Sequence, residues 1–314
     1  MDGRKVLSNI ISSQIDIHKR FGGVVPEIAS RNHTLIIETA VGEALSAAGV
    51  TLEDIEGVAV TYGAGLQGAL LIGLTFAKGL CYALDKKLIG VNHIMGHIAA
   101  NYISHRELEP PFICLVVSGG HTAIVHIKDY TEHEVLGSTL DDAVGEAFDK
   151  VARCLGLSYP GGPNIDRLAA KGRNNIEFPK MLKGGGGYNF SYSGLKTAVI
   201  NYLHNSAQKN EKPVIEDVCA SFQCAAIDVL AEKAVKACRE KNISRLAAAG
   251  GVSANSYLRK TLKEKCSGEN ISLYLPDPVF CTDNAAMIAA EGYIRMKNGM
   301  LSGMDLNVNP SLKI

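Results

Sequence analysis

Hydrophobic and polar positions along the first third of the chain predict alternating helices and strands. A helical stretch near Thr34–Ala48 is followed by a strand over Gly57–Thr61 and a helix near Leu66–Leu84. A short strand, Lys87–Val91, then precedes a segment that is helical from His93 onward. This alternation is typical of an α/β layer.

A proline pair marks the best candidate for a domain boundary. Glu109-Pro110-Pro111 disfavours both helix and central strand, and a β-rich segment follows at once. We therefore expect an N-terminal domain over residues 1–109, completed by a C-terminal helix over residues 285–314. Residues 110–284 are expected to form the second domain.

The predicted second domain carries two glycine turns next to predicted strands. Ser118-Gly119-Gly120-His121 separates the strands Phe112–Val117 and Thr122–Ile127, which predicts a tight hairpin whose backbone amides could face a ligand. A strand over Leu246–Ala249 runs into Gly250-Gly251 and a helix start, an arrangement that brings backbone close to a nucleotide. Each turn is also compatible with an ordinary tight turn.

Between these turns, the spacing predicts a helix over Asp141–Leu155. Its early acidic residues, Asp141, Asp142 and Glu146, would complement the positive end of the helix. Tyr159–Pro163 is predicted to be a loop, and Gly184–Gly187 is predicted to be a second glycine-rich loop.

Composition and charge narrow the class of protein. With 46% hydrophobic and 20% charged residues, the chain has the composition of a folded globular protein. Lys+Arg and Asp+Glu both number 32, so any contact with nucleic acid must be a local patch or be shared with a partner. The 8 cysteines contain no Cys-x-x-Cys pair, which indicates reduced cytosolic thiols rather than a disulfide framework or a thiolate zinc site.

An uncharged stretch over residues 57–77 resembles a membrane span in length. Glycines interrupt it, together with the polar residues Thr61, Tyr62 and Gln67, so we interpret it as a strand, a glycine turn and a buried helix. No apolar segment follows a basic start, so we expect no signal peptide, no membrane contact and a cytoplasmic location.

His93 and His97 are separated by one helical turn, the spacing that lets two imidazoles bind one metal ion. The pair also fits two unrelated histidines at a helix start. A carboxylate from elsewhere would complete the site, and Asp283 is the candidate, although it could equally cap a helix that begins near Ala285. A zincin-type peptidase needs Glu after the first histidine, and Ile94 stands there instead.

Three polar residues near the glycine turns are candidates for holding a ribose or a base. They are Asp149, Asp166 and Asn255, and a solvated helix face explains Asp149 equally well on local grounds. Ser191-Tyr192-Ser193-Gly194 lacks the spacing of a nucleophile elbow, so we expect no serine nucleophile.

Seven motifs of the chain together resemble the bacterial TsaD (Gcp/YgjD) family in order and spacing over nearly its whole length. The motifs are Asn92–His97, Val116–Thr122, Asp141–Lys150, Tyr159–Pro163, Phe190–Thr197, Ala249–Asn255 and Cys281–Asn284. The resemblance implies a tRNA N6-adenosine threonylcarbamoyltransferase with the actin-like ATPase (ASKHA) fold, in which two RNase-H-like domains enclose a nucleotide cleft.

The resemblance also implies the site residues. It makes His93, His97 and Asp283 the ligands of one divalent metal per chain, usually iron, with zinc also compatible. The contacts to the adenylate would come from Val116, Val117, Ser118, Gly119, Gly120, Asp149, Gly162, Asp166 and Asn255.

The implied reaction moves a threonylcarbamoyl group from threonylcarbamoyl-AMP to N6 of adenosine 37, in tRNAs that read codons beginning with A. No covalent enzyme intermediate is required. The implied partners are tRNA, a TsaB-like paralogue on the N-terminal domain and a TsaE-like ATPase. The stretch Thr34–Ala48 and the helix from Leu66 are the expected docking faces.

The chain departs from the family pattern at three places. The family's first hairpin would precede the segment Lys5–Asn9, and here Met1 begins just upstream of that segment. Ala64 stands where the family usually has proline, and Met95 stands where most bacterial members have Glu. We expect Met95 to tune metal affinity without removing a ligand.

Two other functions compete with the transferase. A nucleotide-binding scaffold that lacks catalysis fits the shortened N-terminus, but such relatives generally lack the His-x-x-x-His pair. A metallopeptidase, the older label for such sequences, is disfavoured by Ile94.

Overall fold

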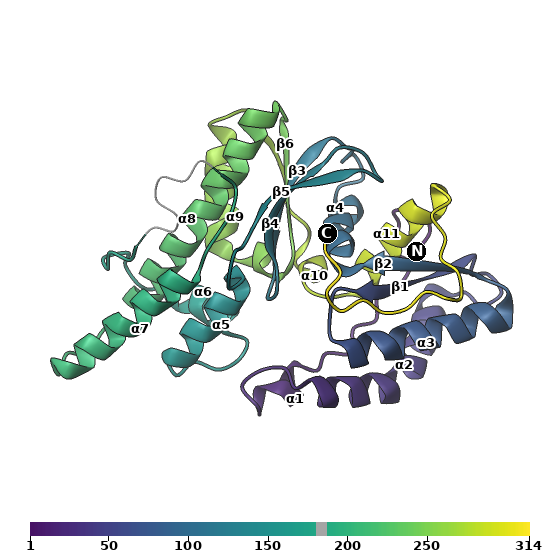
Figure 1. Ribbon diagram of the computed structural model, residues 1–314, viewed down its shortest axis with the longest axis horizontal. Helices are drawn as coiled ribbons and strands as arrows, with labels where there is room; N and C mark the ends of the chain where they lie inside the picture. Colours follow the sequence, from purple (N-terminus) through teal and green to yellow (C-terminus); the bar gives the residue numbers. More distant parts are fainter. Residues whose placement is uncertain (180–186) are drawn as a thin grey trace. The chain divides into compact units, whose positions relative to one another are not determined.

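The computed structural model describes residues 1–179 and 187–314, which form two compact units. Unit 1 comprises Met1–Glu109 and Pro276–Ile314, and unit 2 comprises Pro110–Leu275 (Figure 1). Residues 276–284, which the sequence analysis assigned to the second domain, therefore belong to unit 1. Residues 184–186 of the predicted second glycine-rich loop lie outside the described residues.

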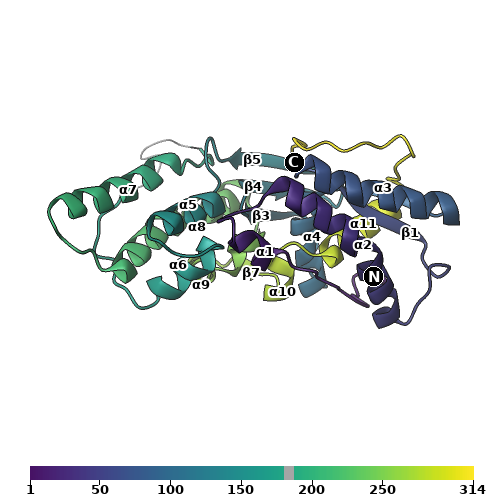
Figure 2. The same ribbon diagram turned by 90° about the horizontal axis from the view of Figure 1, so that it is seen from below.

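Unit 1 is built on two parallel strands, with Val58 paired to Leu88 and Thr61 paired to Val91. Helices α3 and α11 both contact β1, and helix α2 packs on α3 (Figure 2). Its elements are α1 (Ile15–Lys19), α2 (Pro26–Ala48), β1 (Gly57–Gly63), α3 (Gln67–Leu84), β2 (Lys87–Asn92), α4 (His93–Ser104), α10 (Pro278–Cys281) and α11 (Ala285–Lys297).

Two predicted helices of unit 1 have different bounds in the structure. Helix α2 begins at Pro26 rather than near Thr34, because proline is tolerated in the first helical turn, and it ends before Gly49 at φ 68°. The predicted C-terminal helix over 285–314 stops at Lys297. The chain beyond it is irregular and runs beside the sheet, where Ser302 donates to the Leu88 carbonyl at 2.9 Å.

Helix α3 is the one helix among the described residues that is long and apolar enough to cross a membrane. Leu70, Leu74, Ala77 and Cys81 are its buried residues, and the helix packs against β1. One such helix is weak support for a membrane span, because core helices of globular proteins share these features.

Unit 2 contains a five-stranded mixed sheet in the order β5-β4-β3-β6-β7. Strand β3 is antiparallel to β4 and parallel to β6. The strands are β3 (Phe112–Val117), β4 (Thr122–Ile127), β5 (His133–Ser138), β6 (Arg245–Ala249) and β7 (Ser272–Tyr274).

Helices pack on this sheet around one large apolar core, to which β3, α5 and the long helix α8 contribute buried side chains. Phe148 of α5 and Phe222 of α8 meet edge to face with ring centroids 4.9 Å apart. The helices are α5 (Val144–Cys154), α6 (Gly161–Ala169), α7 (Ser193–Gln208), α8 (Ile215–Lys241), the 3₁₀ turn η1 (Gly251–Ala254) and α9 (Ser256–Ser267).

The predicted helix over Asp141–Leu155 begins only at Val144. Glu146 lies in the first turn of α5, as predicted. Asp141 and Asp142 precede the helix. Asp141 binds the start of α7 and Asp142 pairs with two lysines, so the prediction that these two complement the positive end of α5 is wrong. The predicted loop Tyr159–Pro163 is also only partly a loop, because α6 begins at Gly161.

Candidate functional sites

The histidine pair of unit 1 lies at the start of helix α4. The Asn92 side chain accepts a hydrogen bond from the Ile94 amide at 2.8 Å, which caps the helix and places His93 and His97 one turn apart on one face. Their ring centroids are 4.7 Å apart. His97 is buried and His93 is partly exposed.

Asp283 faces both imidazoles from the loop between α10 and α11. Its Oδ1 atom lies 3.5 Å from Nε2 of His93 and 3.3 Å from Nε2 of His97. The helix that follows is capped by Asn284, whose side chain accepts from the Met287 amide at 2.8 Å. The alternative that Asp283 itself caps this helix is therefore wrong.

The charge of Asp283 is stabilised by its two neighbours. Burial alone would raise the pKa of this carboxyl, but a hydrogen bond from His97 and the charges of His93 and His97 lower it to about 2. Burial is the largest single influence on this pKa, but the two histidines together outweigh it, and the side chain is 80% exposed to solvent. Asp283 is thus an anion at neutral pH, as a metal ligand must be.

The three side chains fit a divalent cation. One donor atom from each lies within 4.8 Å of the others, and two imidazoles with one carboxylate form a donor set that suits iron or zinc and leaves positions open. Within the described part of the chain, Nδ1 of His97 is buried without a hydrogen-bond partner. Ile94, which is fully buried, and Met95, which is partly exposed, both have uncharged side chains, so neither adds a charge to the site.

The first glycine turn of unit 2 is the predicted hairpin between β3 and β4. The Ser118 amide donates to the His121 carbonyl at 2.8 Å, and the His121 amide donates to Oγ of Ser118 at 3.1 Å. Gly119 and Gly120 are exposed, and no described atom lies within 4 Å of where a Cβ would stand on either. Their backbone is accessible to a ligand.

Two of the residues predicted to contact the adenylate have side chains in the core. Val116 and Val117 are both 0% exposed, backbone included, and they pair with β4, so neither presents an exposed atom to a ligand.

Helix α5 begins directly against this turn. The Gly145 amide donates to the Ser118 carbonyl at 3.3 Å, and the Val144 amide donates to Oγ1 of Thr122 at 2.8 Å. A Cβ on Gly145 would lie 2.6 Å from the Ser118 carbonyl oxygen and 2.8 Å from Cα of Gly119. Only glycine permits this approach, and no local sequence pattern distinguished Gly145.

The second glycine turn lies beside the first. Strands β3 and β6 are parallel neighbours, with Val116 paired to Ala249, so both turns follow the carboxyl ends of adjacent strands. Gly250 has a φ of 90°, and a Cβ there would lie 2.5 Å from the Val117 carbonyl oxygen. Ligands of open α/β sheets bind at such carboxyl ends.

The polar candidates of unit 2 are joined to helix N-termini near these turns. Oδ1 of Asp149 accepts from the Gly161 amide at 2.7 Å, and burial raises the pKa of Asp149. Asp166 accepts from the amide of Ser256 at 3.0 Å and from its hydroxyl at 2.7 Å. Gly162 lies in the first turn of α6, with no described atom within 4 Å of where its Cβ would stand.

Asn255 is the most constrained of these residues. Its side-chain carbonyl accepts from the Leu258 amide at 2.9 Å, and its side-chain amide donates to Oε1 of Gln223 at 2.8 Å. Gln223 is a buried polar residue on α8, and no motif in the sequence singled it out.

The alternative that Asp149 lies on a solvated helix face is wrong, because its carboxylate accepts a hydrogen bond from the first residue of α6, Gly161.

Comparison with known proteins identifies the family. The family model described as TsaD, tRNA N6-adenosine threonylcarbamoyltransferase, matches residues 5–290. Relatives named tRNA N6-adenosine threonylcarbamoyltransferase from Clostridium perfringens (strain SM101) and Clostridium botulinum (strain 657) are 56% and 53% identical, and each alignment covers 100% of this chain and 93% of the relative.

Two solved structures share the fold of this chain at low sequence identity. Full-length HypF in a phosphate- and nucleotide-bound form aligns with a TM-score of 0.60 at 17% identity, over 83% of this chain and 41% of HypF. HypF from T. kodakarensis aligns with a TM-score of 0.62 at 15% identity, over 83% of this chain and 43% of that one. The fold is that of the actin-like ATPases, as the resemblance implied. The chain belongs to the TsaD family of tRNA N6-adenosine threonylcarbamoyltransferases.

Proposed function

We propose that this chain transfers a threonylcarbamoyl group from threonylcarbamoyl-AMP to N6 of adenosine 37, in tRNAs that read codons beginning with A. The products are threonylcarbamoyladenosine and AMP. The observation that carries the proposal, together with family membership, is the pair of adjacent glycine turns that follow β3 and β6, the first of which leaves Gly119 and Gly120 exposed.

The exocyclic amine of adenosine is a poor nucleophile, so the acyl group must arrive activated as a mixed anhydride with AMP. The amine nitrogen attacks the carbamoyl carbon, the bond to the phosphate oxygen breaks, AMP leaves with the electron pair, and the amine loses a proton. Backbone amides of Gly119 and Gly120 would hold the phosphate. Asp149, Asp166 and Asn255 would hold the ribose and base, and Gly162 would admit the ligand beside α6.

In unit 1, His93, His97 and Asp283 would hold one divalent ion, which we propose to be iron. When bound, the ion supplies a Lewis acid and a template for the donor. The chain's own contribution is to keep Asp283 ionised and the two imidazoles in register on α4.

We also propose that a TsaB-like paralogue docks on unit 1 and that a TsaE-like ATPase and tRNA complete the system in the cytoplasm. Exposed apolar side chains on α2 and α3 support a dock there, since Leu35 is 76% exposed and Tyr82 is 84% exposed. The formal charge of zero favours tRNA being bound with the help of partners.

The deciding experiment measures transfer of labelled threonine to an unmodified tRNA transcript, with synthetic threonylcarbamoyl-AMP and the two partner proteins. We expect incorporation that disappears in the His93→Ala variant. A folded, metal-loaded chain that incorporates nothing would favour the scaffold function instead. Peptide cleavage that a chelator abolishes would favour the peptidase.

A further inference from the structure

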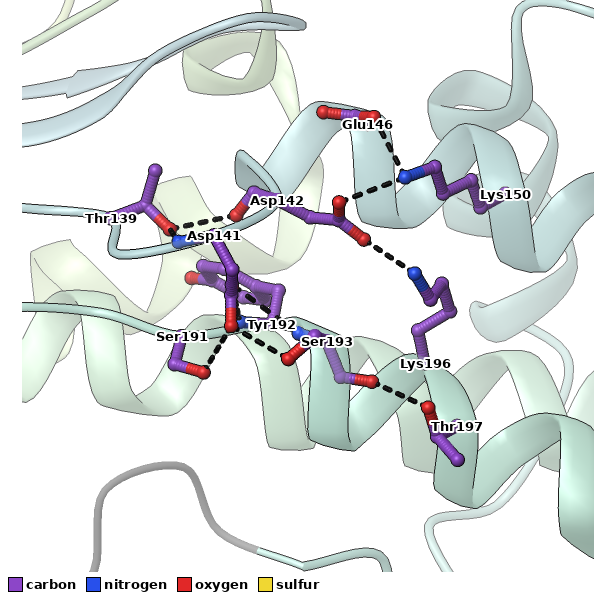
Figure 3. A network of polar contacts seen from close by, with 10 residues as sticks. All are labelled: Thr139, Asp141, Asp142, Glu146, Lys150, Ser191, Tyr192, Ser193, Lys196 and Thr197. Atoms are coloured by element: carbon purple, nitrogen blue, oxygen red, sulfur yellow. Dashed lines mark hydrogen bonds and ion pairs between the residues drawn. The ribbon is translucent and has the colours of Figure 1, made fainter.

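An acidic pair outside both candidate sites joins two helices of unit 2 (Figure 3). Asp141 and Asp142 lie between β5 and α5, where the backbone is not yet helical. Their side chains bind the segment that opens α7, which lies about fifty residues further along the chain.

Asp141 caps α7 from a distant segment. Its carboxylate accepts from Oγ of Ser191 at 2.5 Å, from Oγ of Ser193 at 2.6 Å, and from the amides of Tyr192 at 2.7 Å and Ser193 at 3.3 Å. Partial burial raises the pKa of Asp141, but these hydrogen bonds outweigh it and lower the pKa below its ordinary value. An anion at this place complements the positive end of α7.

Asp142 bridges two helices with one carboxylate. Oδ1 lies 2.8 Å from Nζ of Lys150 on α5, and Oδ2 lies 2.8 Å from Nζ of Lys196 on α7. Lys150 also pairs with Glu146 at 2.7 Å, and Oγ1 of Thr139 donates to the Asp142 carbonyl at 2.7 Å. The Asp142 side chain is only 16% exposed, so this pairing is partly shielded from water.

The helix held in this way is the one that forms part of the nucleotide site. Gly145 of α5 packs on Gly119 of the first turn, and Asp149 of the same helix binds Gly161. A displacement of α5 by a few tenths of an ångström would move both contacts together, because a helix shifts as a rigid element.

We propose that Asp142, Lys150 and Lys196 form an ionic clasp that sets the position of α5 against the Ser118–Gly120 turn, and that Asp142 and Lys196 are therefore positioning residues for the adenylate. This inference rests on the proposed function. Buried ion pairs add little net stability relative to well-packed apolar side chains, and we infer that this triad serves to fix geometry, because each charge must keep its partners. The clasp should accordingly affect nucleotide binding more than folding.

The test uses the full chain and AMP as the probe, with affinity measured by titration calorimetry well below the unfolding temperature. We expect Lys196→Met to weaken AMP binding at least five-fold, and to raise KM for threonylcarbamoyl-AMP while kcat stays within two-fold. Lys196→Arg, which keeps the charge, should restore both values to within two-fold. Lys241→Met, which removes an ion pair to Glu134 at 3.3 Å elsewhere in unit 2, should leave AMP binding unchanged.

Asp142→Asn tests the clasp in a second way, which matters if Lys196→Met does not fold. Asp142→Asn preserves the shape of the side chain and should weaken AMP binding at least as much, and Lys196→Met added to it should cause no further loss. Unchanged AMP affinity in folded Asp142→Asn and Lys196→Met, beside a wild type that binds AMP, would overturn the clasp alone. A wild type that does not bind AMP would overturn the proposed function and the clasp with it.

Discussion

The candidate metal centre of unit 1 and the candidate nucleotide turns of unit 2 are built on opposite principles. The first uses three side chains that present nitrogen and oxygen atoms within 4.8 Å of one another. The second uses backbone that glycine leaves accessible, at Gly119 and Gly120. The metal centre therefore fails when a side chain is removed, whereas the nucleotide turns fail when one is added.

Helix caps show the same difference. In unit 1, the capping residues Asn92 and Asn284 are sequence neighbours of the candidate ligands His93 and Asp283 but are not candidate ligands themselves. In unit 2, Asn255 is both the cap of α9 and a candidate ligand contact. Binding and local stability can thus be separated by mutation in unit 1 and are coupled in unit 2.

The largest effect is expected from removing a metal ligand. His97→Ala should reduce the metal content from one ion per chain to none, and transfer activity by more than about 100-fold, because two ligands remain. Metal analysis of the purified protein and the transfer assay measure both. His105→Ala, at the far end of the same helix, is the matched control and should keep the ion. A His97→Ala protein with full metal content would refute the claim that the three side chains hold the ion in unit 1.

The second effect comes from adding one methyl group to unit 2. Gly250→Ala should lower the free energy of unfolding by about 4 kcal/mol, because its φ of 90° and the nearby Val117 carbonyl leave no room for a Cβ. Gly251→Ala is the control, since no described atom lies within 4 Å of where its Cβ would stand, and should change stability by less than about 1 kcal/mol. Urea unfolding of the two variants measures both free energies of unfolding. Equal losses of stability in Gly250→Ala and Gly251→Ala would contradict the claim that the backbone at Gly250 requires glycine.

The sequence predicted the candidate residues of the two units for different reasons. His93 and His97 were predicted as a pair because helix periodicity alone puts them on one face, and the glycine turns were predicted because Ser118–His121 and Gly250-Gly251 follow recognisable strands. Asp283 as the third ligand needed the family resemblance, because local sequence equally allowed a helix cap there. Asn284 takes that cap in the structure.

The rest depended on contacts between segments distant in sequence. Gln223 lies 32 residues from Asn255, and Asp141 lies 52 residues from Ser193, so no local pattern could connect them. Asp141 and Asp142 were predicted to start a helix because acidic residues favour helix N-termini. Asp141 does serve one, but it is α7 rather than α5, and Asp142 pairs with lysine side chains instead. Local rules identified the residue type correctly and its partner wrongly.

The third effect concerns a buried carboxylate in unit 1 that belongs to neither site. Burial raises the pKa of Glu291 on α11 to about 7, and Arg295 at 3.9 Å offsets this only in part. Below about pH 4.5 the group is protonated in both the folded and unfolded chain, and above it the unfolded chain ionises first. Stability should therefore fall by about 2 to 3 kcal/mol as pH rises from about 4.5 to 7, and no further beyond that.

Urea unfolding at a series of pH values measures how the free energy of unfolding depends on pH, and Glu291→Gln should remove this decrease between about pH 4.5 and 7. A variant with the same pH dependence as the wild type would assign the slope to other groups, such as Asp149 in unit 2, whose pKa burial also raises.

The smallest effect compares the two asparagine caps directly. Asn284→Ala and Asn255→Ala each remove a 2.8–2.9 Å hydrogen bond from a helix N-terminus, so each should destabilise the chain by about 1 kcal/mol. Their functional consequences should differ. Asn284→Ala leaves all three metal ligands and the AMP affinity intact, whereas Asn255→Ala also leaves Gln223 without its partner and should weaken AMP binding at least five-fold. Paired measurements of metal content and AMP affinity test this difference. Equal AMP affinity in the two variants would mean that Asn255 acts only as a cap, and that the two units differ less than their geometry indicates.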